Sequence, residues 1–248
     1  MRRCFALLAL CCAAATAAAE DEAAQAALDL RLFRAAQREA FGEVDSALEE
    51  GADIDGLVPV GPPEDPGASK VTALMQAALD GRVAAVEYLL EQGADADQPD
   101  AFGFTPMHGC AFRGQAAACS ALLAAVGPTS ETALHYHADG FAPLHRTCFG
   151  NTGSPATLRV FLEAGVAPDL PSIEDRAGRG GRPGTTCRDV ASADEVTALL
   201  DEFAPPASSN TDGSAKRRAK GGGRMGKSKG TKKAELSVDD ILASHPDL

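Results

Sequence analysis

Cysteines and histidines are the residues of this 248-residue chain whose types allow the most specific chemistry. Three of the seven cysteines lie at the extreme N-terminus, and the other four are Cys110, Cys119, Cys148 and Cys187. None of these four forms a Cys-x-x-Cys pair, and their spacings match no zinc-binding pattern. The sequence therefore leaves these thiols two roles, as small buried apolar side chains or as members of disulfides.

The histidines offer little more than the cysteines for catalysis or metal binding. His135 and His137 form a His-x-His pair, but the sequence supplies no spaced third ligand for a metal ion. No phosphate-binding loop, Gly-x-Ser-x-Gly, His-Glu-x-x-His or paired-carboxylate signature is present. We therefore expect no enzyme, no cofactor and no bound metal, and an enzyme that uses His135, His137 and a cysteine is the weakest hypothesis.

The composition predicts that helices position these residues. The chain is 45% hydrophobic and 23% charged, which is typical of a globular protein. Aromatic residues make up only 5% and tryptophan is absent, so the core must consist mostly of Ala, Leu and Val. Such a core favours closely packed helices over a β-sandwich. No apolar run reaches the ~20 residues that a membrane span needs.

Charge is distributed unevenly along the chain. Residues 20–203 carry 30 acidic and 12 basic side chains, whereas residues 204–248 carry 5 acidic and 9 basic ones. The acidic body argues against a nucleic-acid-binding face on the folded part, because contact with phosphates needs cations.

The N-terminus has the pattern of a secretory signal peptide. Two arginines are followed by an apolar stretch from Cys4 to Ala15 and by small residues just before the acidic leader at 20–26. We expect residues 1–19 to be removed by cleavage after Ala19, which places the protein in the secretory pathway or outside the cell. If this segment is not a functional signal, the basic tail favours the nucleus instead.

A repeated pattern runs through the middle of the chain. Its clearest copy reads Asp-Ala-Phe-Gly-Phe-Thr-Pro-Met-His from Asp100 to His108, followed by Gly114 and a pair of leucines. Further copies place Thr72 33 residues before Thr105, and His145 37 residues after His108. These residues resemble the ankyrin repeat, whose pattern is DxxGxTPLHxAAxxGxxxxVxxLLLxxGAD.

The resemblance covers residues 27–203 and implies an all-α fold. It implies a solenoid of stacked helix-turn-helix units with β-hairpin loops, in five repeats near 28–55, 71–97, 100–127, 138–169 and 182–203. The first and last copies are atypical, as expected for ends of a stack that face water. Residues 56–70, rich in Gly and Pro, are expected to form a projecting loop between the first two repeats.

Local physical chemistry supports the same repeats. Thr105 can cap the helix that Pro106 begins, since proline is tolerated in the first helical turn. Gly93 and Gly165 suit a left-handed residue after each outer helix. Leu89 and Leu122 are expected on the buried stripe of their outer helices.

Placing the cysteines and histidines on the repeats assigns them structural roles. We expect four small buried apolar cysteines, and disulfides between adjacent repeats remain open if the chain is secreted. The resemblance implies that His108 and His145 hydrogen-bond the backbone of neighbouring loops.

Ankyrin-type stacks bind other proteins through hairpin tips and the concave face of the inner helices, so the resemblance implies a non-catalytic protein–protein interaction module. Aromatic and arginine side chains are enriched in binding hot spots. The candidates that stand where the pattern leaves the residue free are Phe102, Phe104, Arg113, Phe141, Arg146 and Phe149. An alternative is that some of these phenylalanines pack between adjacent hairpins. The acidic surroundings favour a partner with basic flanks.

The C-terminal segment, residues 204–248, cannot bury a core and is expected to be disordered. Its basic residues all lie between positions 216 and 233: Lys216, Arg217, Arg218, Lys220, Arg224, Lys227, Lys229, Lys232 and Lys233. The alternative function is therefore a polyanion or nucleic-acid binder that acts through this tail, with the repeats as scaffold.

Overall fold

The computed structural model describes residues 2–61, 69–149, 154–173, 182–191 and 193–203, with side chains from residue 20 onward. These residues belong to one compact unit, Met1–Ala204. The predicted basic tail and its nine cations lie outside the described residues, as do the side chains of the predicted signal peptide.

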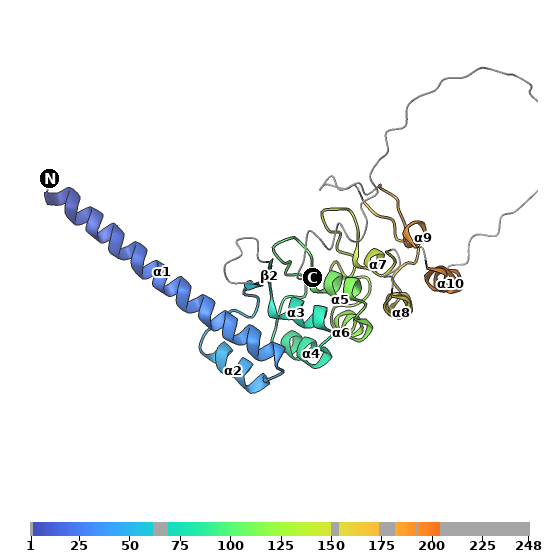
Figure 1. The fold of residues 1–248 in the computed structure, drawn as a ribbon, viewed down its shortest axis with the longest axis horizontal. Helices are drawn as coiled ribbons and strands as arrows, with labels where there is room; N and C mark the ends of the chain where they lie inside the picture. The colour runs from blue at the N-terminus through green and yellow to red at the C-terminus, as the bar shows by residue number, and fades with distance from the viewer. Residues whose placement is uncertain (1, 62–68, 150–153, 174–181, 192, 204–248) are drawn as a thin grey trace, which may run out of the picture. The chain divides into compact units, whose positions relative to one another are not determined.

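Helices alternate along the described chain as the inner and outer members of successive pairs (Figure 1). The inner helices are α1 (Arg2–Gln37), α3 (Ala73–Asp80), α5 (Pro106–Arg113), α7 (Pro143–Arg146) and α9 (Cys187–Val190). The outer helices are α2 (Phe41–Glu49), α4 (Val83–Glu91), α6 (Ala116–Val126), α8 (Pro155–Ala164) and α10 (Asp194–Phe203). Within the described residues each inner helix is followed along the chain by an outer one.

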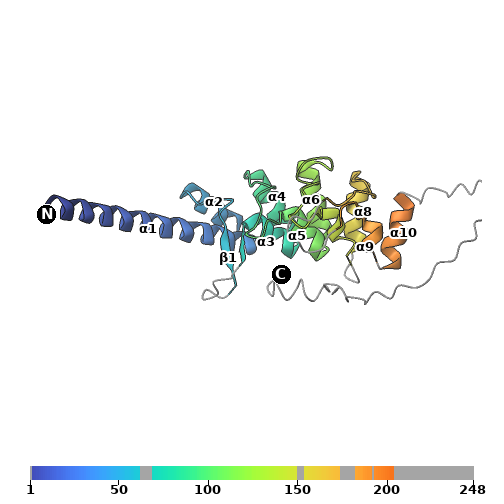
Figure 2. The ribbon, with the colours of Figure 1, turned by 90° about the horizontal axis from the view of Figure 1, so that it is seen from above.

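The pairs stack in chain order to make two layers. Each inner helix contacts the next inner helix along the chain, and α4, α6, α8 and α10 form the corresponding outer series. Figure 2 shows α2, α4, α6 and α8 along one side of the row. No helix in the part of the chain described here is long and apolar enough to cross a membrane. The all-α solenoid with short hairpin strands is confirmed.

Capping residues set where the helices begin and end. Thr72 accepts a hydrogen bond from the backbone N–H of Met75 (3.1 Å) at the start of α3, and Pro106 opens α5 directly after Thr105. Gly93 and Gly165 have φ values of 91° and 100°, so the left-handed residues predicted after the outer helices are confirmed.

Small side chains allow the inner helices to approach closely. A Cβ added to Gly109 on α5 would lie 3.0 Å from the sulfur of Met75 on α3, so a larger residue would require the side chains on α3 to shift. Leu89 and Leu122 are buried on the outer helices, as predicted. The core therefore runs continuously between the two layers.

The insertion after the first repeat is more ordered at its base than a projecting loop. Strands β1 (Val58–Val60) and β2 (Ser69–Val71) pair antiparallel, with Val58 opposite Val71. Both of these valines are buried, which explains why the ends of a Gly/Pro-rich segment adopt a hairpin. The connecting residues 62–68 lie outside the described chain.

Candidate functional site

The loops that precede the inner helices form a row of short turns, which we call fingers. The third finger spans residues 100–104 and the fourth spans residues 137–141. In the third, the Asp100 side chain accepts hydrogen bonds from the backbone N–H groups of Phe102 (2.9 Å) and Phe104 (2.8 Å). These bonds close the turn and set the direction of the finger.

Histidine replaces this aspartate at the start of the fourth finger. The backbone N–H of His137 donates to the carbonyl of Phe141 (3.1 Å), as that of Asp100 does to Phe104 (2.8 Å). The His137 Nε2 also donates to the carbonyl of Phe102 (3.0 Å), and its ring stacks on Phe104 with centroids 3.8 Å apart. One side chain thus joins two adjacent fingers.

Arg146 lies inside the finger row, which corrects the expectation that it stands on an exposed concave face. The residue is only 8% exposed, and its Nη2 donates to the Asp139 Oδ2 at 2.5 Å. Its guanidinium carbon lies 5.2–5.8 Å from the ring centroids of Phe104, Phe141 and Phe149. A buried arginine needs a charged partner, and Asp139 in the fourth finger supplies it.

We call these residues the Arg146 cluster: Phe104, His137, Asp139, Phe141, Arg146 and Phe149. Burial opposes ionisation of Asp139, but the hydrogen bond from His137 and the charge of Arg146 outweigh it and lower the pKa of this carboxyl. The Nδ1 of His137 lies 3.0 Å from the Asp139 Oδ1. The carboxylate of Asp139 therefore holds the side chains of both His137 and Arg146 in place.

The two motif histidines have the predicted structural role. The Nε2 of His108 donates to the carbonyl of Phe141 (3.3 Å), and that of His145 donates to the carbonyl of Thr185 (3.2 Å). Burial lowers the pKa of both rings, and the charge of Arg146 lowers them further. Both imidazoles therefore stay neutral and tie one repeat to the next finger.

The predicted aromatic candidates divide into two groups. Phe104, Phe141 and Phe149 are half-buried in the Arg146 cluster, so the alternative that phenylalanines pack between hairpins is correct for Phe104. Phe102 is 37% exposed at the tip of the third finger. Arg113 is exposed at the end of α5 and has no place in the cluster.

Sequence reasoning missed two exposed apolar residues of the same edge. Leu57, just before β1, is 40% exposed, and Ile173 is 37% exposed. The backbone N–H of Ile173 donates to the carbonyl of Gly140 (2.9 Å), and that of Ala101 donates to Lys70 on β2 (3.0 Å). Together with the bond from His137 to Phe102, these bonds connect the β1–β2 hairpin, the third and fourth fingers and residues 171–173 into one finger row.

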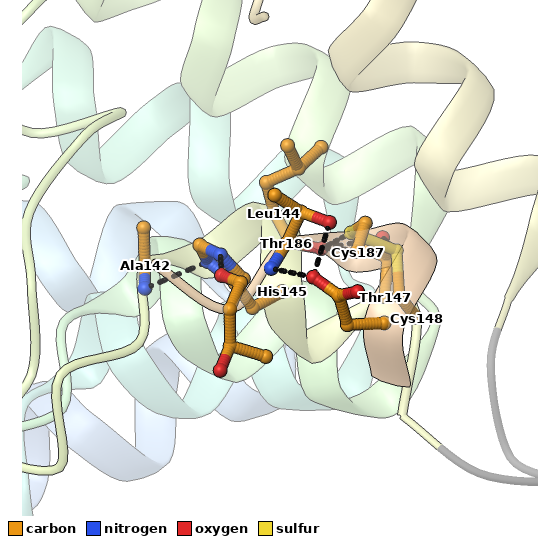
Figure 3. Close-up of a disulfide and its surroundings, with 9 residues drawn as sticks. Ala142, Leu144, His145, Thr147, Cys148, Thr186 and Cys187 are labelled. Atoms are coloured by element: carbon orange, nitrogen blue, oxygen red, sulfur yellow. Dashed lines mark hydrogen bonds between the residues drawn. A yellow bond between two sulfur atoms is a disulfide. The ribbon is translucent and has the colours of Figure 1, made fainter. Parts of the chain in front are cut away.

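The four cysteines of the repeats are buried as predicted, and they are paired rather than free. Cys110 joins Cys119 across the two helices of the third repeat, and Cys148 joins Cys187 between the fourth and fifth repeats. Figure 3 shows the second disulfide beside Leu144 and His145. The spacings gave no pairing because residues nine positions apart meet only when α5 and α6 fold back on each other.

The His-x-His pair is occupied by protein contacts. Both ring nitrogens of His137 face Phe102 or Asp139, and the ring of His135 lies edge-on to His108 at 5.8 Å. Among the described residues, no group of three or more His, Cys, Asp or Glu is placed to hold a metal ion.

Comparison with known families agrees with this geometry. A family model for ankyrin repeats, in three copies, matches residues 32–132 and 74–172, which together span more than half of the chain. A search of curated proteins finds no match. The stacked helix pairs, the motif histidines that bond adjacent fingers and the matched residues all lead to one conclusion: the chain belongs to the ankyrin repeat family.

Proposed function

We propose that this protein is a non-catalytic binding module whose finger row contacts a partner protein. Ankyrin repeats generally mediate protein–protein interactions, and the family is typically non-catalytic. The observation that carries the proposal is the position of the exposed apolar side chains. Every large hydrophobic residue of the described chain that is exposed lies at the finger row, namely Leu57, Phe102 and Ile173.

The rigidity of the row supports this proposal. The Arg146 cluster and the two motif histidines hold adjacent fingers by a buried ion pair, stacked rings and hydrogen bonds. A surface that is already ordered loses little conformational entropy when a partner binds. Exposed apolar side chains on a rigid edge are otherwise a liability for solubility, so a binding role accounts for them.

The test begins with the full chain as bait, followed by affinity measurements with the partner that it identifies. Phe102→Ala should weaken binding by about 2 kcal/mol if the residue is an anchor. Phe41→Ala is the matched control, because Phe41 stacks on Tyr88 away from the fingers. Equal affinity of wild type and Phe102→Ala, with both folded, would place the interface elsewhere.

We also propose that the protein works in the secretory pathway or outside the cell. Two disulfides support this location, because such bonds persist in oxidising compartments and are rare in the cytosol and nucleus. The signal-like residues 1–19 agree with it. Mass spectrometry of the protein purified from its own cells should show a mature chain that begins at Glu20. An intact N-terminus with reduced cysteines would refute the proposal.

A further inference from the structure

One segment of the finger row, residues 171–173, is held in place by the start of the fifth repeat. The backbone N–H of Ser172 donates to the carbonyl of Thr185 (2.8 Å), and that of Gly184 donates to the carbonyl of Ser172 (2.9 Å). The Ser172 hydroxyl donates to the carbonyl of Arg182 (2.7 Å) and accepts from the backbone N–H of Thr185 (3.0 Å). These bonds tie the segment to the chain just before α9.

The same segment also bonds the fourth repeat and carries an exposed side chain of the finger row. The backbone N–H of Ile173 donates to the carbonyl of Gly140 (2.9 Å), and the hydroxyl of Tyr136 donates to the carbonyl of Pro171 (2.8 Å). Ser172 is only 4% exposed, whereas Ile173 beside it is 37% exposed. The position of the Ile173 side chain therefore depends on the buried Ser172 and, through it, on the fifth repeat.

The disulfide between Cys148 and Cys187 fastens this part of the fifth repeat, residues 182–187, which we call the anchor segment. The Nε2 of His145 lies beside the disulfide (Figure 3) and donates to the carbonyl of Thr185 in the same segment (3.2 Å). Helix α9, which begins at Cys187, has only 4 residues, so its own packing adds little. The disulfide is therefore the main restraint on the anchor segment.

The surroundings of the two disulfides differ in how readily they open. All four cysteines are 0% exposed, so a reductant reaches a sulfur only when the chain around it opens locally. The Cys148–Cys187 bond joins the regions of α7 and α9, helices of 4 residues each, whereas Cys110–Cys119 joins α5 and α6, of 8 and 11 residues. Helix α10 packs separately against α8, so the anchor segment can open without it. We therefore expect Cys148–Cys187 to be reduced first.

We propose that the Cys148–Cys187 disulfide is a redox latch that controls binding at the finger row. This inference rests on the proposed function of the row and adds its regulation. With the disulfide formed, the anchor segment holds Ser172, and Ile173 stands in the row beside the fourth finger. When a dithiol reduces the bond, the anchor segment is released, Ile173 loses its support, and the binding surface is incomplete.

The reduction is an ordinary thiol–disulfide exchange. A thiolate of the dithiol attacks one sulfur of the pair, breaks the Cys148–Cys187 bond and forms a mixed disulfide. The second thiolate of the dithiol then breaks the mixed disulfide and closes the disulfide of the reductant. Cys148 and Cys187 thereby gain two electrons, and they take up the two protons that the dithiol loses.

Stepwise reduction of the full chain tests the latch without any partner. Dithiothreitol is added in increasing amounts, free thiols are alkylated, and the labelled cysteines are located by mass spectrometry. Cys148 and Cys187 should be labelled at a lower dithiol concentration than Cys110 and Cys119. Labelling of both pairs together, or of Cys110 and Cys119 first, would overturn the inference, because the latch would then open only as the stack unfolds.

Amide hydrogen exchange shows what the reduction releases. At the dithiol concentration that reduces only Cys148–Cys187, the amides of Ser172, Gly184 and Thr185 should exchange at least about tenfold faster, because their hydrogen bonds join the two segments. The amides of α3 and α5 should be unchanged. Replacing both cysteines by Ala should give the same pattern without any reductant. Protection retained in that variant would show that packing alone holds the anchor segment, and the inference would be wrong.

A serine variant tests the link between the anchor segment and Ile173. Ser172→Ala keeps the disulfide and removes the two hydrogen bonds of the hydroxyl, so it should speed exchange at Thr185 in the oxidised chain. Ser130→Ala is the matched control. Its hydroxyl also donates to a carbonyl, that of Gly127, and accepts from a backbone N–H, that of Ala133, and its loss should leave Thr185 unchanged. Equal effects of the two variants would contradict the link.

Binding is measured with the purified partner protein that the full-chain bait identifies. Reduction of the latch and Ile173→Ala in the oxidised chain should each weaken this binding by at least about fivefold, because both remove the Ile173 contact. The chain with Ala at 148 and 187 should bind as weakly as the reduced wild type, and the dithiol should not weaken it further.

The outcomes separate this inference from the proposed function. If Phe102→Ala weakens binding but reduction and Ile173→Ala do not, the finger row binds without this regulation, and only the inference is wrong. If none of the three changes the affinity, the inference and the proposed function both fail.

Discussion

The second and third repeats are held together differently from the fourth and fifth. In the first region the inner helices α3 and α5 are each 8 residues long, and they pack through Met75, Leu79 and the bare backbone of Gly109. In the second region α7 and α9 have only 4 residues each. There the Cys148–Cys187 disulfide joins the fourth repeat to the fifth, and the Arg146–Asp139 ion pair holds the fourth finger against α7.

Helix length explains the difference. A helix of four residues is barely one turn long, so it forms few backbone hydrogen bonds of its own and buries little apolar area. It therefore cannot stabilise its own conformation or its packing on the neighbouring helix. A covalent bond and a buried ion pair supply local order that does not depend on helix length. In both regions a motif histidine hydrogen-bonds the next repeat. The repeats therefore stack in the same way, although helix packing stabilises one region and a disulfide with an ion pair stabilises the other.

The largest expected effect is the loss of the buried ion pair. Arg146→Met should destabilise the fourth and fifth repeats by about 4–5 kcal/mol, because it leaves Asp139 buried without its main cation and removes three ring contacts. Amide hydrogen exchange, measured repeat by repeat, should show the loss there and not in α3 and α4. Arg113→Met is the control. Uniform loss across all repeats would abolish the contrast between the regions.

The disulfides should rank by the length of chain that they close. Replacing Cys148 and Cys187 by Ala should cost about 4 kcal/mol, against about 2.5 kcal/mol for Cys110 and Cys119, because the sequence separations are 39 and 9 residues. Urea unfolding of the two double variants gives both values. The reverse order would mean that native packing, rather than the entropy of the unfolded chain, determines the effect.

A core substitution tests the region that relies on packing. Leu89→Ala should lower the free energy of unfolding by about 3 kcal/mol, since this side chain is buried on α4. The midpoint in urea should fall at an unchanged slope. An unchanged midpoint would show that packing contributes less to the second repeat than we infer.

Lowering the pH should destabilise the contacts that His108 and His145 make with the next repeat. The folded-state pKa of His108 is lowered, so the unfolded chain binds more protons below about pH 6.5, and stability must fall as the pH drops from 7 to 5. The loss should grow with each step of acidification through this range. Thermal unfolding at several pH values measures it, and His108→Gln should flatten the slope. The lowered pKa of Asp139 adds a further loss only below about pH 4.

The smallest effect on stability is expected at the exposed tip. Phe102→Ala should lower the free energy of unfolding by less than Phe104→Ala does, because Phe102 is 37% exposed at the finger tip whereas Phe104 is half-buried in the Arg146 cluster. Phe104→Ala in the same finger should cost about 3 kcal/mol by losing its contacts with His137 and Arg146. Chemical denaturation of both variants measures the two costs. Equal costs would contradict the assignment of Phe102 to binding and of Phe104 to structure.

Local sequence determined the repeats themselves. The Thr-Pro-x-His starts, the leucine pairs and the glycines after the outer helices act within one helix or turn, so their periodicity is visible without tertiary structure. The same is true of the structural role of His108 and His145, which the motif implied. Even the atypical Glu39, which stands where the pattern has glycine, keeps the left-handed conformation with φ of 56°.

Tertiary structure alone decided which polar and aromatic side chains meet. Arg146 is the last residue of α7, and nothing local to it indicates that Asp139, seven positions earlier, turns back to its guanidinium. Cys148 and Cys187 are 39 residues apart, and they become neighbours only because α7 and α9 stack. Exposure, ion pairing and disulfide formation depend on distances between repeats. A repeat pattern specifies each unit, whereas the packing of one unit on the next sets those distances.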